Sequence, residues 1–304
     1  MIEPVEGSRY LPSVDALEST MRAGNSALAA GDMDGALRAF NHALRLKPRY
    51  DVAWMARGQA LLRIGDLDAS LKSFAEAIVI RPQGEEAWSA LAAVLHRMGR
   101  HGEELEAYEE LLKVNARNVE AMVNRAAALH ELRRYDEAVA ACDAALALRP
   151  EYAPAWNNKG AALVRRGRVE EGLRCFDEAL HFDPPYFDAL ANRIFALQKL
   201  GRHGETVMAT DRALKLREAP WLYYLRGLSH LALYESTAAV RSFERALALD
   251  PSLKEAKEAL RRPRRLQSSV DFDRGVYECF GTHEVGDPGC AECEIQARCR
   301  EVTP

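Results

Sequence analysis

The sequence predicts an all-α solenoid of about seven helix pairs, followed by a capping helix and a small cysteine-rich tail. Three observations lead to this class. Several kinds of residue recur at intervals of 34. Each interval contains two amphipathic patterns with helical spacing, and no alternating pattern of the kind that forms a sheet accompanies them. Stacked helix pairs are the architecture that such a pattern indicates.

Composition restricts the class of protein further. The chain has 304 residues, of which 48% are hydrophobic and 28% are charged, with a formal net charge of −4. Such a composition is not that of a disordered or membrane protein, and it lacks the excess positive charge of nucleic-acid-binding domains. The first residues do not resemble a signal peptide, and no stretch approaches the ~20 apolar residues that cross a bilayer. We therefore expect a cytoplasmic protein without a membrane contact.

Four series of residues share the 34-residue interval. Prolines 48, 82, 150 and 184 are separated by 34 or 68 positions, and tryptophans 54, 88 and 156 follow the same spacing. The third series consists of Phe40, Phe74, Tyr108, Cys142, Phe176, Thr210 and, one residue early, Phe243. The fourth consists of Ala43, Ala77, Leu111, Ala145, Ala179, Ala213 and, again one residue early, Ala246. Agreement among four series predicts a true structural repeat.

Each repeat contains two predicted helices. In the fifth repeat, apolar residues follow helical spacing over 155–166 and again over 169–180, and Gly167 separates the two stretches. Pro184 closes the repeat, because proline cannot continue a helix. A small residue in the first helix allows the paired helices to approach closely, and these residues are Gly58, Ala92, Ala126, Gly160 and Gly227. Neither helix can bury its apolar face alone, so stability must come from stacking.

These patterns resemble the tetratricopeptide-repeat family. The shared features are Trp-x2-Arg/Lys-Gly, then Gly-Asp, then Ala-x3-Phe-x2-Ala and a closing proline. The resemblance implies a right-handed superhelix, with a concave groove lined by the first helix of each repeat and a protein or peptide as partner. We predict an extension over 1–16, seven repeats over 17–253, a capping helix over 254–262, and a linker and tail over 263–304. The repeats are predicted at 17–50, 51–84, 85–118, 119–152, 153–186, 187–219 and 220–253.

Amide side chains form the first candidate site in this groove. Asn124, Asn158 and Asn192 are each 34 residues from the next, and Asn157 lies beside one of them. An amide is both donor and acceptor, so it can bind the main chain of an extended peptide without reading its side chains. The resemblance implies the same use. The alternative is that these asparagines bind neighbouring helices or water.

Basic side chains form two further series. The first consists of Arg57, Arg125, Lys159, Arg193 and Arg226, with Leu91 as the exception. The second consists of Arg63, Arg97, Arg165 and Lys199, interrupted by Glu131. Such residues can bind the carboxylates of a partner. The alternative is that they are solvated and pair with nearby acidic residues.

The remaining polar residues give no catalytic pattern, so we expect no enzyme. His96 and His130 are 34 residues apart and are expected to line the groove rather than to bind a metal. Glu103 and Glu104, like Glu170 and Glu171, begin predicted second helices, where the helix dipole favours acidic residues. Cysteines 142 and 175 lie among packing positions and are expected to be small core residues.

The tail carries a second candidate site. Cys279, Cys290, Cys293 and Cys299 have the spacing C-x10-C-x2-C-x5-C, and a Pro-Gly turn precedes the closest pair. Four cysteines in a short segment predict a metal site, either zinc or a [4Fe–4S] cluster. The C-x2-C-x5-C end resembles the iron–sulfur loops of certain DNA glycosylases and nucleases, although the first spacing is longer. With zinc, His283 could replace one cysteine.

The function predicted from these features is a protein–protein interaction scaffold that binds an extended peptide in the groove. The alternative is a nucleic-acid-associated adaptor or a redox sensor, which would use an iron–sulfur cluster and the basic run Arg261–Arg265. Steep salt dependence would favour nucleic acid. The sequence leaves the partner's identity and the oligomeric state open.

Overall fold

The computed structural model describes residues 14–268, 270–271 and 276–277. Over these residues it contains fifteen helices and two short strands. The helices are α1 Val14–Ala30, α2 Met33–Leu46, α3 Asp51–Ile64, α4 Leu67–Ile80, α5 Glu85–Arg97, α6 His101–Val114, α7 Val119–Glu131, α8 Tyr135–Leu148, α9 Ala153–Arg165, α10 Val169–Phe182, α11 Phe187–Lys199, α12 His203–Leu216, α13 Pro220–Ala232, α14 Ser236–Leu249 and α15 Lys254–Ser268. Strands β1 Val270–Asp271 and β2 Val276–Tyr277 pair antiparallel, with Val270 opposite Tyr277.

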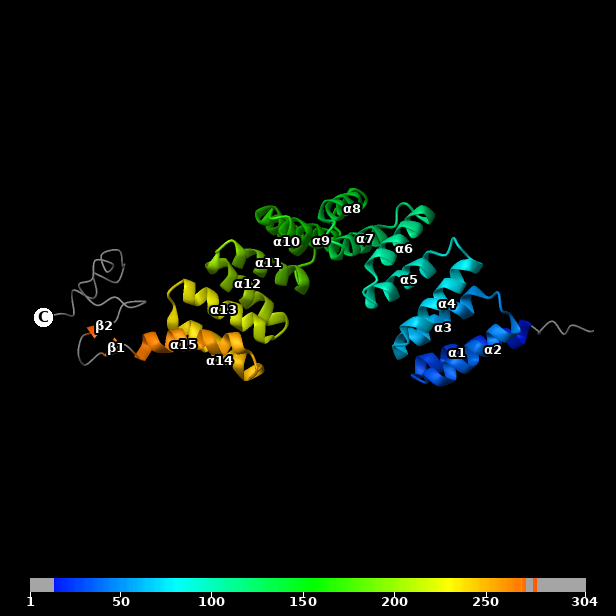
Figure 1. Cartoon of the computed structure of the whole chain (residues 1–304), viewed down its shortest axis with the longest axis horizontal. Coiled ribbons are helices and arrows are strands. Elements are labelled where there is room, and N and C mark those ends of the chain that lie inside the picture. The colour runs from blue at the N-terminus through cyan, green and yellow to red at the C-terminus, as the bar shows by residue number, and fades with distance from the viewer. Residues whose placement is uncertain (1–13, 269, 272–275, 278–304) are drawn as a thin grey trace, which may run out of the picture. The chain divides into compact units, whose positions relative to one another are not determined.

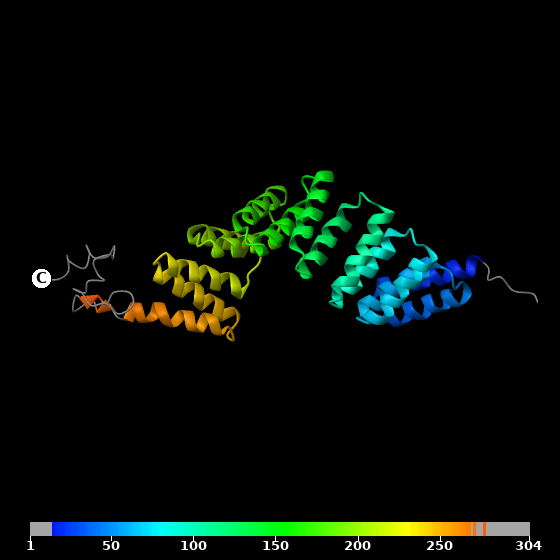
Figure 2. The same cartoon turned by 45° about the horizontal axis from the view of Figure 1, so that its top comes forward.

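The chain divides into two compact units after Ala162, within α9. The first unit contains α1 to α8 and most of α9, and the second contains the end of α9 and α10 to α15. Inside each unit, helices pack on the helices next to them in sequence, so that each repeat is a helical hairpin stacked on its neighbour (Figures 1 and 2). The prediction of an all-α repeat solenoid is confirmed for these residues.

Paired helices touch where a small residue on the first helix faces a large one on the second. A Cβ atom added at Gly58 of α3 would lie 2.6 Å from the Phe74 ring of α4, and Phe74 is fully buried. The same relation joins Gly24 to Phe40 and Gly227 to Phe243. Because even a methyl group would overlap the ring, glycine at this position sets how closely the two helices of a hairpin approach.

The turn between paired helices requires a left-handed backbone conformation. Gly65 has φ = +92° and ends α3. Arg133 and Tyr234 adopt the same conformation in the fourth and seventh repeats, with φ of 59° and 61°. Glycine adopts this conformation without steric cost, whereas other L-residues do so at some cost in energy.

The second helices of the first six repeats begin in two different ways. The carboxylates of Asp32 and Asp66 cap α2 and α4 by accepting hydrogen bonds from the backbone. In the third to sixth repeats an arginine stands at this position and pairs with the glutamate three residues later. Arg100 and Glu103 form the pair in α6, at 2.5 Å. The acidic residue remains in the first turn of the helix, where the positive end of the helix dipole stabilises its negative charge.

Consecutive repeats are joined by a recurring bond to the closing proline. Trp54 Nε1 donates to the carbonyl oxygen of Pro48 at 2.9 Å, Trp88 does the same to Pro82 at 2.9 Å, and Trp156 to Pro150 at 2.7 Å. The periodic tryptophans and prolines of the sequence are therefore partners. An indole N–H that lies against the hydrophobic core needs such an acceptor.

The ends of the helical region differ from the prediction. Helix α1 begins at Val14, three residues before the first predicted repeat, and α15 continues through Pro263 to Ser268 instead of ending at 262. Proline costs a helix one hydrogen bond and restricts the residue before it, which ends most helices but does not forbid continuation. Over the described ranges, none of the helices combines the length and apolar character needed to cross a membrane.

Candidate functional site

The predicted groove residues lie on the first helices of their repeats. Asn124 and Arg125 belong to α7, Asn157 to Lys159 belong to α9, and Asn192 and Arg193 belong to α11. The division of the chain places the amides of α7 and α9 in the first unit and Asn192 in the second. The two groups are therefore described separately.

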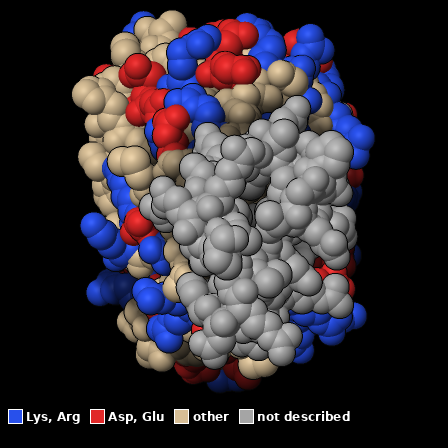
Figure 3. Space-filling view, turned by 90° about the vertical axis from the view of Figure 1, so that its left-hand side faces the viewer, with Lys and Arg blue, Asp and Glu red and all other residues tan. Residues whose placement is uncertain are grey.

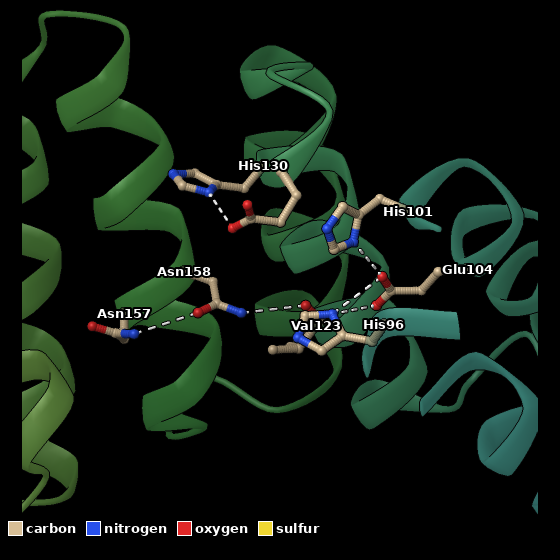
Figure 4. A network of polar contacts seen from close by, with 8 residues as sticks. His96, His101, Glu104, Val123, His130, Asn157 and Asn158 are labelled. Carbon is tan, nitrogen blue, oxygen red and sulfur yellow. Dashed lines mark hydrogen bonds and ion pairs between the residues drawn. The ribbon is translucent and has the colours of Figure 1, made fainter. Parts of the chain in front are cut away.

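In the first unit, the amides of Asn157 and Asn158 bond to each other and to a neighbouring helix. Asn158 donates from Nδ2 to the carbonyl oxygen of Val123 on α7 at 3.3 Å, and it accepts from Asn157 Nδ2 at 3.4 Å (Figure 4). Asn157 is only 6% exposed. These contacts join α9 to α7, which is the neighbour-helix role that the sequence leaves as the alternative.

Asn124 differs because its side chain is exposed. It is hydrogen-bonded to Tyr108 on α6, a phenol whose pKa burial raises to about 12. An amide can make more than one hydrogen bond, so Asn124 keeps capacity for a ligand. Asn192, in the second unit, is half-buried on α11.

The first basic series connects successive repeats. Lys159 Nζ lies 2.6 Å from Asp143 Oδ1, and Arg193 Nε lies 2.6 Å from Asp177 Oδ1. Arg226 pairs with Asp211 at 2.8 Å, and Arg125 approaches Glu109 at 3.9 Å. Arg57 donates instead to Asn41 Oδ1 at 2.8 Å and to Ser73 Oγ at 2.6 Å. In each case the cation on a first helix reaches the second helix of the preceding repeat, so these side chains already have anionic or polar partners.

The second basic series lies near the ends of the first helices. Arg63 Nη1 donates to the carbonyl oxygen of Leu28 at 3.3 Å, and Arg97 Nη1 donates to that of Leu62 at 3.2 Å. Both acceptors lie near the end of the first helix of the preceding repeat. The negative end of that helix dipole stabilises a cation there. Arg165 and Lys199 are exposed at the ends of α9 and α11.

Where Leu91 interrupts the first basic series, the third repeat contains a pocket of about 350 Å³. Its apolar lining comes from Trp88, Leu91 and Leu95 of α5 and from Ala107 of α6. The remaining lining residues are all glutamates of α6, namely Glu103, Glu106, Glu109 and Glu110. Leucine carries no charge and cannot pair with a carboxylate, and the glutamates of α6 give the site its acidic character.

Three of the four glutamates are already paired. Glu103 binds Arg100, whose hydrogen bonds lower the pKa of that carboxyl. Glu110 binds Lys113 at 2.6 Å, and Glu109 faces Arg125. For Glu106, which is exposed, no ion pair is found among the described residues. The pocket therefore combines an apolar floor with an excess of negative charge.

Glu104 is a residue whose role the sequence does not reveal. Its carboxylate is 3% exposed and contacts His96 of α5 and His101 of α6 (Figure 4). Its position at the start of a helix suggested only a dipole contact, but that explanation fits the neighbouring Glu103, which faces solvent. The interval of 34 could have indicated it, since the equivalent residue in every other repeat is small.

The remaining candidate residues are cysteines. Cys142 and Cys175 are buried in α8 and α10, in agreement with a packing role. Cys279, Cys290, Cys293 and Cys299, with His283, lie outside the described residues, and their metal site stays a prediction.

Comparison with known proteins agrees with this architecture. A sequence profile of the tetratricopeptide repeat matches residues 21–85, 90–153 and 132–187, and a second such profile matches 222–253. No curated protein sequence matches the chain.

Among solved structures, a tetratricopeptide repeat protein from Parabacteroides merdae is 21% identical, with a TM-score of 0.64, covering 82% of this chain and 99% of that one. PilF of Pseudomonas aeruginosa is 19% identical, with a TM-score of 0.59, covering 68% of this chain and 95% of that one. A chain of the Cut9–Hcn1 hetero-tetramer of the APC/C is 17% identical, with a TM-score of 0.61, covering 82% and 54%. The first profile alone matches more than half of the sequence, and the chain belongs to the tetratricopeptide repeat family.

Proposed function

We propose that this protein is an interaction scaffold that binds an extended segment of a partner protein, and that the third repeat holds a basic side chain of that segment. Proteins of this family generally mediate protein–protein interactions. The observation that carries the finer proposal is the pocket of α5 and α6, with its apolar floor and four glutamates. Its volume is large enough to admit any side chain of a partner.

Lysine or arginine fits this pocket better than any other side chain. The aliphatic stem of either residue can cover Leu91 and Leu95, while the charged end stays among the carboxylates. Trp88 adds an aromatic ring, which attracts a cation over its face. Glu106 is the carboxylate best placed to receive the charge, because the other three have cations nearby.

Asn124 supports an extended main chain next to this pocket. Its amide is hydrogen-bonded to Tyr108 of α6, the helix that supplies the glutamates of the pocket. We propose that Asn124 binds a peptide group of the partner, while Asn157 and Asn158 hold α9 against α7. Asn192 would serve the same purpose as Asn124 within the second unit.

The basic series supports a basic rather than an acidic partner. An acidic segment would have to displace existing contacts such as Lys159–Asp143, whereas a basic one can bind Glu106, for which no ion pair is found among the described residues. Lysine and arginine are also interspersed with aspartate and glutamate over the face seen in Figure 3. Mixed charge of this kind is typical of a solvated surface and does not favour a polyanion.

For the tail we propose that Cys279, Cys290, Cys293 and Cys299 hold either zinc or a [4Fe–4S] cluster, on the basis of their spacing alone. Metal analysis and visible absorbance of protein purified without oxygen separate the two. About four irons with acid-labile sulfide would identify a cluster and favour the redox or nucleic-acid alternative. Zinc without colour would identify a structural staple, and the absence of both metals would refute the proposal.

The groove proposal is tested by selecting binders from a random peptide display library with the full-length chain. We expect selected peptides to share a lysine or arginine. The Kd of a labelled selected peptide should rise at least about tenfold in Glu106→Lys, which corresponds to about 1.4 kcal/mol. Glu76→Lys on α4 is the matched control, because Glu76 is exposed and is not a pocket residue. Equal affinity for both variants and the natural protein would refute the pocket.

A further inference from the structure

Glu104 stands at a repeat position that otherwise holds only small residues. The equivalents in the other six repeats are Ala36, Ser70, Ala138, Gly172, Thr206 and Ala239, and all six are buried. The position lies where the second helix packs on the first. A long acidic side chain there is unfavourable for packing and loses the hydration of its charge. Packing therefore does not account for the glutamate.

Two histidines surround this buried carboxylate. His96 Nδ1 lies 3.1 Å from each carboxylate oxygen of Glu104, and His101 Nδ1 lies 2.9 Å from Oε2. The imidazole rings meet edge to face with centroids 5.4 Å apart. Figure 4 shows both rings directed at the carboxylate from two different helices, α5 and α6. One ligand atom from each residue lies within 4.8 Å of the others.

We propose that His96, His101 and Glu104 bind a Zn²⁺ ion. Imidazole nitrogen and carboxylate oxygen are ligands that zinc accepts at about 2.0–2.2 Å, and tetrahedral ligands at that distance lie roughly 3.4 Å from one another. The two histidine–carboxylate separations of 2.9–3.1 Å need only a small expansion to reach this geometry, and all three ligand atoms lie within 4.8 Å of one another. The ion neutralises a carboxylate that the protein has removed from water, which is one of the few ways in which buried charge is accommodated.

Each histidine can offer Nδ1 to a metal when its imidazole is neutral. A neutral imidazole carries its proton on either ring nitrogen, so a shift of the proton from Nδ1 to Nε2 frees Nδ1 for the metal. The side chain of His96 is 53% exposed, whereas that of Glu104 is 3% exposed. Water can therefore reach the ion on the side of His96 and complete its coordination, and the ion has a path into the site.

Other repeats carry parts of this arrangement without completing it. In the fourth repeat His130 is the equivalent of His96, but Tyr135 and Ala138 replace the other two ligands. His130 contacts Glu131 at 3.4 Å and the ring of Tyr135 instead. Within the described part of the chain, only the third repeat brings three such ligands together. The combination is therefore not a by-product of the repeat pattern.

Zinc at this point would join the end of α5 to the beginning of α6. The three ligands bracket the turn that contains Gly99, so the ion closes the open end of the hairpin. Because a metal that binds only the folded state stabilises that state, zinc should raise the thermal midpoint of the protein. This inference does not depend on the partner segment, since the ligands are not residues of the pocket floor.

Isothermal titration with zinc chloride tests the site. The protein is the full-length chain in which the four tail cysteines are serine (Cys279→Ser, Cys290→Ser, Cys293→Ser and Cys299→Ser), so that thiolates cannot compete. We expect one equivalent of zinc to bind. Glu104→Ala and His101→Ala should each weaken binding at least about tenfold, since even groups that only orient a metal ligand contribute tenfold or more. His130→Ala is the matched control and should bind like its parent.

Two further measurements distinguish loss of the zinc site from misfolding of the variant. Glu104→Ala introduces the residue of the first, fourth and seventh repeats, so its helicity and thermal midpoint without metal should equal or exceed those of the parent. Cobalt bound by the parent should show d–d bands without thiolate charge transfer. Failure of the parent to bind one equivalent of zinc, or unchanged affinity in Glu104→Ala, would overturn the proposal.

Discussion

The second and third repeats are neighbours in one unit and have the same register, yet they use the same positions differently. In the second repeat Arg57 bonds to the preceding repeat, Gly58 faces Phe74, and Ser70 donates to the carbonyl oxygen of Gly58 at 2.8 Å. Each of these side chains holds the hairpin together. In the third repeat the equivalents are Leu91, Ala92, Tyr108 and Glu104. These residues leave a pocket, a buried carboxylate and a phenol bonded to Asn124.

The difference shows which properties the repeat fold requires. Three different residue pairs occur where the two helices of a hairpin approach most closely: glycine with phenylalanine, alanine with tyrosine, and alanine with cysteine. The fold therefore requires that the two residues together fill the space, not that either one is fixed. The buried position of Glu104 can hold a long acidic side chain because His96 and His101 form hydrogen bonds with its carboxylate. A residue that departs from the repeat pattern and is compensated by a neighbouring side chain marks a candidate functional site.

The largest expected effect comes from giving the second repeat the acidic residue of the third. Ser70→Glu should lower the free energy of unfolding by about 3–5 kcal/mol, because Leu62 and Leu67 stand where the histidines would be and leave the charge unpaired. Urea denaturation followed by circular dichroism measures the change. The reciprocal variant Glu104→Ala should cost little or nothing, because alanine suits the position. Equal destabilisation by both variants would contradict the comparison.

A smaller effect is expected where the two helices approach most closely. Gly58→Ala should lower the free energy of unfolding by about 1–3 kcal/mol, since its methyl group would overlap Phe74 and overpacking exceeds the gain in helix propensity. Adding Phe74→Cys removes the ring that the methyl group overlaps, and alanine and cysteine are the pair that packs in the fourth repeat, but the change also deletes buried volume.

A double-mutant cycle at this pair measures the coupling directly. The two changes together should cost less than the sum of the single changes, and additivity would show that Gly58 and Phe74 do not share space. A stabilising effect of Gly58→Ala alone would likewise contradict the packing account.

Periodicity allowed much of the fold to be predicted, because a repeat states the same structure several times. The first helices after the first repeat begin at Asp51, Glu85, Val119, Ala153, Phe187 and Pro220, which are the starts of the repeats in the sequence. The end of α15 was not predicted, because proline usually stops a helix and the 34-residue pattern ends before it. Periodicity does not extend to a segment that occurs once.

The candidate site was less predictable because it depends on differences between repeats. In the sequence, Leu91 is only an interruption of a basic series. The pocket beside it is not evident there, because its charged residues are glutamates of the second helix. The partners of the basic residues lie 15 or 16 positions earlier, a separation that only the stacking of helices reveals. In the sequence, Glu103 and Glu104 both fit the preference for acidic residues in the first turn of a helix. Only the burial of the Glu104 side chain in the structure distinguishes the two.

The most direct test of the account exchanges the residues that open the pocket in one repeat and close it in the other. In full-length protein, Leu91→Arg should place a guanidinium at the wall of the pocket and raise the Kd of a selected basic peptide at least about tenfold, while circular dichroism checks that the variant keeps its helicity. Arg57→Leu, the matched change in the second repeat, should leave the Kd as it is. Unchanged affinity in Leu91→Arg, or an equal loss in Arg57→Leu, would contradict the claim that the third repeat binds the partner.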